Sequence, residues 1–187
     1  ELKELNFRSF QYAISKCIYD KVDFVLISGD LFDSAYPPIE TLKETFNEFR
    51  KLKEANIPVF LIAGSHDYSA SGKTFLDVLE KSGFSINASK YEEKDGKIFL
   101  SPIVYKNVAI YGYSGKKSGL EVDDMEKIKL QDSPGLFKIY LIFCLTISST
   151  KFNAKSKRWI RSPDSTIGDD CGNKSVSISR FESVKEY

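Results

Sequence analysis

The chain has 187 residues, and its 27 lysines and arginines nearly balance 26 aspartates and glutamates, leaving a formal net charge of +1. This length is enough for one domain with a substantial hydrophobic core. The low net charge excludes a strong overall field that would attract nucleic acid or an anionic membrane, although a local basic groove is enough to bind DNA.

The cysteines and the hydropathy pattern place further bounds on the protein. Cys17, Cys144 and Cys171 lie far apart and are odd in number. We therefore expect a reduced, cytoplasmic protein and not a disulfide framework or a zinc finger. No apolar run approaches the ~18 residues that span a bilayer, so the sequence predicts no membrane segment.

The first part of the chain alternates between helical and strand patterns. Apolar residues at helical spacing mark three helices, and two continuous apolar runs between them indicate buried strands. Each of these runs ends in a glycine followed by polar residues. The connections are long enough for parallel pairing of the two strands. The predicted helices span 7–18, 39–52 and 74–82, and the predicted strands span 23–30 and 58–64.

The third predicted helix has recognisable ends. Thr74 and Asp77 have the spacing of a capping box, and Gly83 is a typical stop signal.

From residue 88 the segments become shorter. Turn signals at Asp95-Gly96 and Lys106-Asn107 separate runs with strand patterns, which predicts antiparallel pairing. The expected result is a sheet with parallel and antiparallel parts, flanked by helices. The antiparallel strands are predicted over 88–94, 97–104 and 107–113, a helix over 118–131 and another strand over 136–143.

The pattern fails after about residue 150. Residues 151–187 contain eight Lys/Arg, five Asp/Glu and many serines, so the charge balance changes from −2 in residues 1–150 to +3. Apolar residues are scattered there without a helical or strand period. We therefore divide the chain into a folded domain over 1–150 and a poorly packed or flexible tail over 151–187, with a further folded element as the alternative.

Two loops at strand ends concentrate the residues that are capable of chemistry. "GDLFD" follows the first predicted strand and "GSHDYS" the second, and together they carry Asp30, Asp33, Ser65, His66 and Asp67. We expect these residues on one rim, because chemistry in open α/β sheets gathers beyond the carboxyl ends of the strands. Each residue alone has a plainer interpretation, since an aspartate after a strand often caps a turn. Because two neighbouring strands both end in such loops, a functional site is as well supported as the plainer interpretation that these residues only cap turns.

The motifs "GDLFD", "GSHD" about thirty residues later, and "GKTFLDVLE" together resemble the calcineurin-like metallophosphoesterases. Within them the sequence is most similar to the Mre-eleven/SbcD nucleases of DNA double-strand-break repair, particularly archaeal members. The resemblance covers roughly residues 5–145. It implies an α/β fold in which two mixed β-sheets pack face to face and are flanked by helices.

The same resemblance implies an activity and its partners. The expected reaction is metal-dependent hydrolysis of phosphodiester bonds in DNA, with two manganese ions as cofactors. The expected partners are DNA and an SMC-like ABC ATPase of the Rad-fifty/SbcC type. A homodimer is expected to form through helices near the second motif.

Four residues receive roles from the resemblance. Asp30 matches the carboxylate that bridges the two metal ions, a role that suits a ligand with two hard oxygens. Asp33 matches the carboxylate that orients the catalytic imidazole, and His66 matches that imidazole, which stabilises or protonates the leaving oxygen. Ser65 stands where the family usually has an asparagine that binds metal. A hydroxyl is a poorer neutral donor, so we expect Ser65 to act only through water.

Two departures from the family pattern bear on activity. The family's D-x-H motif is expected before the first helix, upstream of the first residue of this sequence, and no histidine follows His66. The family's later histidine motifs are expected after the strand over 137–143, where Cys144 and its neighbours stand. Since a two-metal site holds cations about 4 Å apart and needs several ligands, we expect an inactive or severely weakened chain. Two alternatives stay open: a general metallophosphodiesterase or phosphatase, and a non-catalytic scaffold module that binds an ABC-type ATPase.

Overall fold

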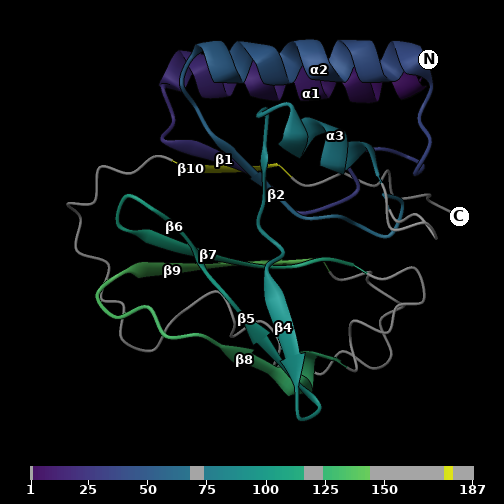
Figure 1. The fold of residues 1–187 in the computed structure, drawn as a ribbon. Coiled ribbons are helices and arrows are strands. Elements are labelled where there is room, and N and C mark those ends of the chain that lie inside the picture. The colour runs from purple at the N-terminus through teal and green to yellow at the C-terminus, as the bar shows by residue number, and fades with distance from the viewer. Residues whose placement is uncertain (1, 68–73, 116–123, 144–174, 179–187) are drawn as a thin grey trace, which may run out of the picture.

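The computed structural model describes residues 2–67, 74–115, 124–143 and 175–178. In these ranges three helices lie over one face of a parallel sheet, and two smaller sheets lie beneath its other face (Figure 1). No helix in the same ranges is long and apolar enough to cross a membrane. The elements are α1 Leu2–Asp20, β1 Phe24–Ile27, α2 Ile39–Glu54, β2 Val59–Leu61, α3 Phe75–Lys81, β3 Ile86–Asn87, β4 Tyr91–Lys94, β5 Lys97–Leu100, β6 Ile103–Tyr105, β7 Val108–Tyr113, the 3₁₀ helix η1 Met125–Lys127, β8 Ile128–Leu130, β9 Phe137–Ile142 and β10 Ser175–Ile178.

The first sheet has the order β10-β1-β2-β3, and all its pairings are parallel. This confirms the two predicted parallel strands. Successive side chains of a strand point to opposite faces, so β1 contributes to two cores. Val25 and Ile27 pack under the helices, whereas Phe24 and Leu26 pack against the sheet below.

The second sheet has the order β6-β7-β9, and the third has the order β4-β5-β8. The strand β7 separates the core beneath the first sheet from one further core, because Val108 and Ile110 face the first sheet while Tyr111 and Tyr113 face the third. The antiparallel pairs β4-β5 and β6-β7 confirm the predicted hairpins. The predicted strand over 97–104 is divided at Pro102, which has no amide hydrogen to continue the ladder. The α/β class and the stacking of sheets are therefore as predicted, although a third sheet, β4-β5-β8, packs on the far face of the second.

The helix predicted over 118–131 is wrong at its C-terminal end. Residues 128–130 form β8, which pairs with β5 in parallel, and Ile128 packs against the core beneath β7. This tertiary pairing overrides the helical preference of the Lys- and Glu-rich local sequence. Residues 118–123 lie outside the described residues. So does the predicted tail, apart from β10, which pairs with β1.

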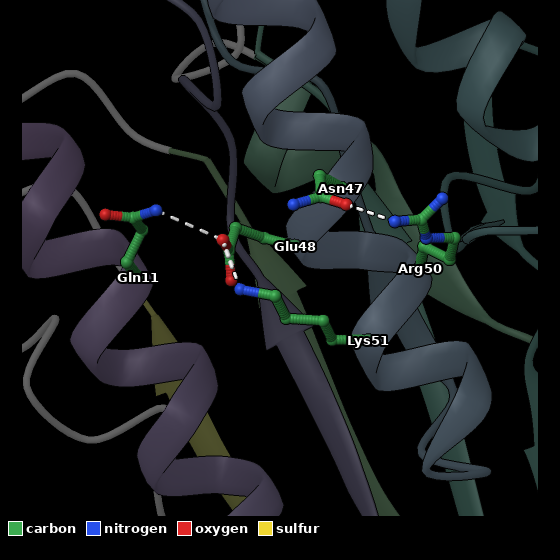
Figure 2. A network of polar contacts seen from close by, with 5 residues as sticks. All are labelled: Gln11, Asn47, Glu48, Arg50 and Lys51. Atoms are coloured by element: carbon green, nitrogen blue, oxygen red, sulfur yellow. Dashed lines mark hydrogen bonds and ion pairs between the residues drawn. The ribbon is translucent and has the colours of Figure 1, made fainter.

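Helices α1 and α2 are joined by a buried polar contact as well as by apolar packing. The side chain of Glu48 on α2 is 1% exposed, and its Oε1 accepts hydrogen bonds from Gln11 Nε2 at 3.1 Å and Lys51 Nζ at 2.7 Å (Figure 2). Its second oxygen, Oε2, is buried and has no hydrogen-bond partner within the described ranges. Glu48 therefore links the two helices but leaves one buried acceptor unsatisfied.

Candidate functional site

The two loops singled out in the sequence meet at the carboxyl ends of β1 and β2. Asp67, which is 2% exposed, accepts hydrogen bonds from the backbone amides of Gly64 at 2.9 Å, Phe32 at 3.1 Å and Leu31 at 3.3 Å. These donors belong to both loops, so one carboxylate holds the loops together. Phe32 is itself buried in the core beneath the helices, which attaches the first loop to the body of the protein.

Two glycines allow the loops to approach each other closely. A Cβ on Gly64 would lie 2.2 Å from both the backbone nitrogen and the Oδ1 atom of Asp30. Gly29 has a φ of +105°, and a Cβ there would lie 2.8 Å from the Cα of Gly64. Any side chain at these positions would separate the loops, because real Cβ contacts are never so short. The glycines predicted at the strand ends thus bring the two loops of the site together.

Asp30 reaches across from the first loop to the second. Its Oδ1 accepts a hydrogen bond from the backbone amide of His66 at 2.9 Å. Its backbone has a φ of +49°, in the left-handed region where aspartate is one of the few residues that is tolerated. The left-handed turn directs the carboxylate toward the loop of His66, so the predicted neighbourhood of the two residues is present.

The imidazole of His66 is held by the main chain of the first loop. His66 Nδ1 lies 3.0 Å from the main-chain oxygen of Asp33. A carbonyl oxygen can only accept a hydrogen bond, so this contact requires the tautomer with a proton on Nδ1. His66 is exposed, and its Nε2 is then the nitrogen that can exchange a proton with a bound molecule. The role predicted for the Asp33 carboxylate, orientation of the imidazole, stays a prediction.

The remaining predicted residue, Ser65, lies half-buried in the second loop between Gly64 and His66. All four predicted site residues are therefore on the two converging loops. Sequence reasoning placed Asp67 on the same rim but gave it no role. Its position next to the only histidine was visible, but a carboxylate buried by backbone donors cannot be recognised without the fold.

Burial dominates the electrostatics of Asp67. Removal from water raises the pKa of its carboxyl above the usual 3.8, and the nearby charge of Asp30 adds to the rise. The hydrogen bonds from the backbone amides of Gly64, Phe32 and Leu31 lower the pKa but do not cancel this rise. The hydrogen bonds favour the charged form, but they do not fully replace hydration. Asp67 therefore serves to assemble the loops at an electrostatic cost.

Two more strand ends complete this edge of the molecule. The Gly115 amide after β7 donates to the carbonyl of Ala63 at 2.9 Å, and the Ala63 amide donates to Ser114 Oγ at 3.2 Å. After β9, the Phe143 amide donates to the carbonyl of Tyr113 at 3.3 Å. The carboxyl ends of β1, β2, β7 and β9 thus meet around the two loops.

The described residues do not fit a two-metal centre. Within the described ranges there is no group of three or more His, Cys, Asp and Glu side chains placed to hold a metal ion. Both oxygens of Asp67 accept backbone hydrogen bonds, and Oδ1 of Asp30 accepts one from His66. Asp30 and Ser65 are too few to replace the hydration shells of two cations.

Comparison with known proteins places the chain among phosphoesterases. Residues 4–162 match the family model described as calcineurin-like phosphoesterase. The DNA double-strand break repair protein Mre11 of Methanosarcina mazei is 35% identical over 128 residues, which cover 68% of this chain and 19% of that protein. Mre11 of Methanococcus maripaludis is 34% identical over 143 residues, which cover 73% of this chain and 36% of that protein.

A relative outside the archaeal Mre11 proteins is also similar. The uncharacterized metallophosphoesterase YhaO of Bacillus subtilis is 30% identical over 116 residues, which cover 60% of this chain and 26% of that protein. The chain thus spans between about a fifth and about a third of the length of these relatives.

Proposed function

Because the chain belongs to the calcineurin-like phosphoesterase family, we propose that its site serves metal-dependent hydrolysis of DNA phosphodiesters, as in a nuclease of double-strand-break repair. The observation that carries this proposal is the convergence of two strand-end loops that put Asp30 beside His66. The similarity to archaeal Mre11 proteins over about two thirds of the chain supports DNA as the substrate. In this proposal residues 1–150 form the phosphoesterase domain and 151–187 a poorly packed tail.

His66 is the catalytic acid in the proposed reaction. As the bond between phosphorus and the leaving oxygen breaks, the imidazolium of His66 transfers the proton on Nε2 to that oxygen. The Asp33 carbonyl accepts the hydrogen bond from Nδ1, which sets the plane of the ring and leaves Nε2 to face the substrate. We propose that the carboxylate of Asp33 also helps to orient the imidazole.

Divalent cations are implied by the family, and we propose manganese as their identity. Asp30 is the proposed bridging ligand, and Ser65 acts only through water. Because the described residues lack a ligand cluster, we propose that the chain by itself binds these ions weakly and is inactive or severely weakened.

A cleavage assay with two substrates tests the proposal. The chain is incubated with Mn²⁺ and either a DNA duplex or a chromogenic phosphodiester, beside the Mre11 of Methanosarcina mazei. We expect DNA cleavage at least about 100-fold slower than that of the relative, because each lost metal partner typically costs about 10–100-fold. The His66→Ala variant should fold normally and lose the residual cleavage. Unchanged cleavage by this variant would show that His66 is not the acid.

The similarity to YhaO favours one alternative, a general metallophosphodiesterase or phosphatase on the same fold. Cleavage of the small ester without cleavage of DNA would support this alternative over the nuclease.

The lack of a metal-ligand cluster in the described ranges favours the other alternative, a non-catalytic scaffold. Such a module would bind an SMC-like ABC ATPase of the Rad-fifty/SbcC type without hydrolysing DNA. Binding of Mn²⁺ in the micromolar range in a calorimetric titration would contradict the scaffold, which is expected to bind no Mn²⁺ in that range.

For the nuclease we propose the same ATPase as partner, a cytoplasmic location and a homodimer formed through α2 and α3. Exposed apolar side chains on both helices support that interface: Ile39 is 71% exposed and Val78 is 43% exposed. The free thiol of Cys17 is consistent with a reducing compartment.

A further inference from the structure

The aromatic ring of Phe143 lies at the edge where the site is assembled. Phe143 directly follows β9, and its amide donates to the carbonyl of Tyr113 at 3.3 Å, so the backbone is held beside the end of β7. Its side chain is partly buried and packs on the core between the first and second sheets. The direction of β9 therefore delivers this side chain toward the carboxyl ends of β1 and β2.

The ring fills the space between the glycines that follow two strands, Gly29 after β1 and Gly115 after β7. A Cβ on Gly29 would lie 2.5 Å from Phe143 Cδ2, and a Cβ on Gly115 would lie 2.3 Å from Phe143 Cδ1. The same position on Gly29 is 2.8 Å from the Cα of Gly64, whose own Cβ position is 2.2 Å from Asp30 Oδ1. The ring is thus within the reach of one side chain from the loops that carry Asp30 and His66.

We propose that Phe143 keeps this site from holding a divalent cation. The ring lies against Gly29, the residue before Asp30, and an aromatic ring offers no oxygen or nitrogen donor to a cation. The ring also displaces the water that would complete a coordination shell. The side chain at position 143 is thus one local cause of the misfit between the described residues and a two-metal centre, besides the missing ligand motifs. This inference rests on the proposed function, because it takes the site to be the phosphoesterase centre.

The Phe143→His variant of the full chain tests the inference directly. An imidazole is no larger than the phenyl ring, so it fits between the glycines, and it supplies a nitrogen ligand suited to late first-row divalent ions such as Co²⁺. Titration with Co²⁺ is followed by the d–d absorption of the ion and by calorimetry. We expect Phe143→His to bind Co²⁺ at least about tenfold more tightly than the unmodified chain, the lower bound of the effect of a metal partner.

Two further variants show whether the gain comes from the ligand. Phe143→Leu keeps the position apolar and should bind Co²⁺ as weakly as the unmodified chain. Adding Asp30→Asn to Phe143→His should abolish the gain, because the new ligand needs the carboxylate beside it. Equal Co²⁺ affinity of the unmodified chain and Phe143→His, or an equal gain in Phe143→Leu, would overturn the inference.

A chemical rescue covers the case in which Phe143→His does not fold, as judged by circular dichroism. Phe143→Ala opens the same space, and free imidazole in solution can then enter it. We expect Co²⁺ binding by Phe143→Ala to increase with imidazole concentration. A Co²⁺ affinity that does not change with imidazole concentration would overturn the inference. Because the readout is metal binding and not cleavage, failure of this inference is distinguishable from failure of the proposed function, which the assays with DNA and the small ester test.

Discussion

A single carboxylate organises the candidate site. Asp67 accepts three backbone hydrogen bonds from two loops that are more than thirty residues apart in the sequence. The residues with proposed chemical roles, Asp30 and His66, are neighbours only because these loops are joined. Asp67 therefore acts on the site through the backbone, while its own burial raises its pKa. Loss of this carboxylate should affect stability and the geometry of His66 together.

The Asp67→Asn variant is expected to be less stable at neutral pH by about 1–3 kcal/mol. An amide group replaces one acceptor oxygen with a donor, which then faces a backbone N–H. The measurement is the free energy of unfolding from urea titrations. The matched control is Asp95→Asn in the exposed β4–β5 turn, where asparagine tolerates the φ of +52° equally well.

The difference in unfolding free energy between the unmodified chain and Asp67→Asn should also depend on pH, and the direction of this dependence can be derived. The pKa of Asp67 is raised by folding, so between the unfolded and folded pKa values the folded chain binds more protons. The contribution of Asp67 to stability therefore falls as the pH rises through this window, which begins near the ordinary 3.8. The stability gap between the unmodified chain and Asp67→Asn should widen on acidification. A gap that narrows would mean that the hydrogen bonds outweigh desolvation.

At the scale of elements, periodicity and end signals were enough to predict most of the first sheet and its helices. The Thr74 amide donates to Asp77 Oδ2 at 2.7 Å, which confirms the predicted capping box of α3. Gly83 has a φ of +67°, as expected for a stop signal. The failures have a common cause, because β8 and the contacts of Phe143 depend on non-local pairing. A local pattern does not contain the information that Ile128 pairs with Ile98.

The contact between α1 and α2 provides a prediction about an element. Gln11→Ala removes one donor from the buried Glu48 carboxylate and should destabilise the fold by about 1–3 kcal/mol. The double variant Gln11→Leu/Glu48→Leu should be close to neutral or stabilising, because it removes a buried charge whose Oε2 has no partner in the described ranges.

The control for this pair lies on the same helix. Asn47 accepts a hydrogen bond from Arg50 at the surface of α2 (Figure 2). Asn47→Ala should change the unfolding free energy by less than about 0.5 kcal/mol. The measurement is urea unfolding at neutral pH. A double variant as unstable as Gln11→Ala would show that the polar contact stabilises the helix pair in net terms.

At the scale of the whole molecule, the layered arrangement separates a helical face from the edge that carries the site. The helices lie over one face of the first sheet, and the site lies at the carboxyl ends of its strands (Figure 1). Family membership could be predicted from the two loop motifs, whereas the contacts of Phe143 and Asp67 could not be known without the fold.

The proposed homodimer leads to the last prediction. Ile39→Asp and Val78→Asp each put a charge on an exposed apolar position of α2 or α3, so they should leave the folded chain intact. In a dimer interface, an unpaired buried charge costs enough to raise the dissociation constant at least about tenfold. Sedimentation velocity across a wide range of protein concentration measures this constant. The control is Tyr12→Asp on α1, a helix outside the proposed interface. The Tyr12 side chain is 72% exposed, so the added charge should not disturb the fold. Dissociation by Tyr12→Asp alone would place the contact on α1, and a monomeric unmodified chain would contradict the homodimer itself.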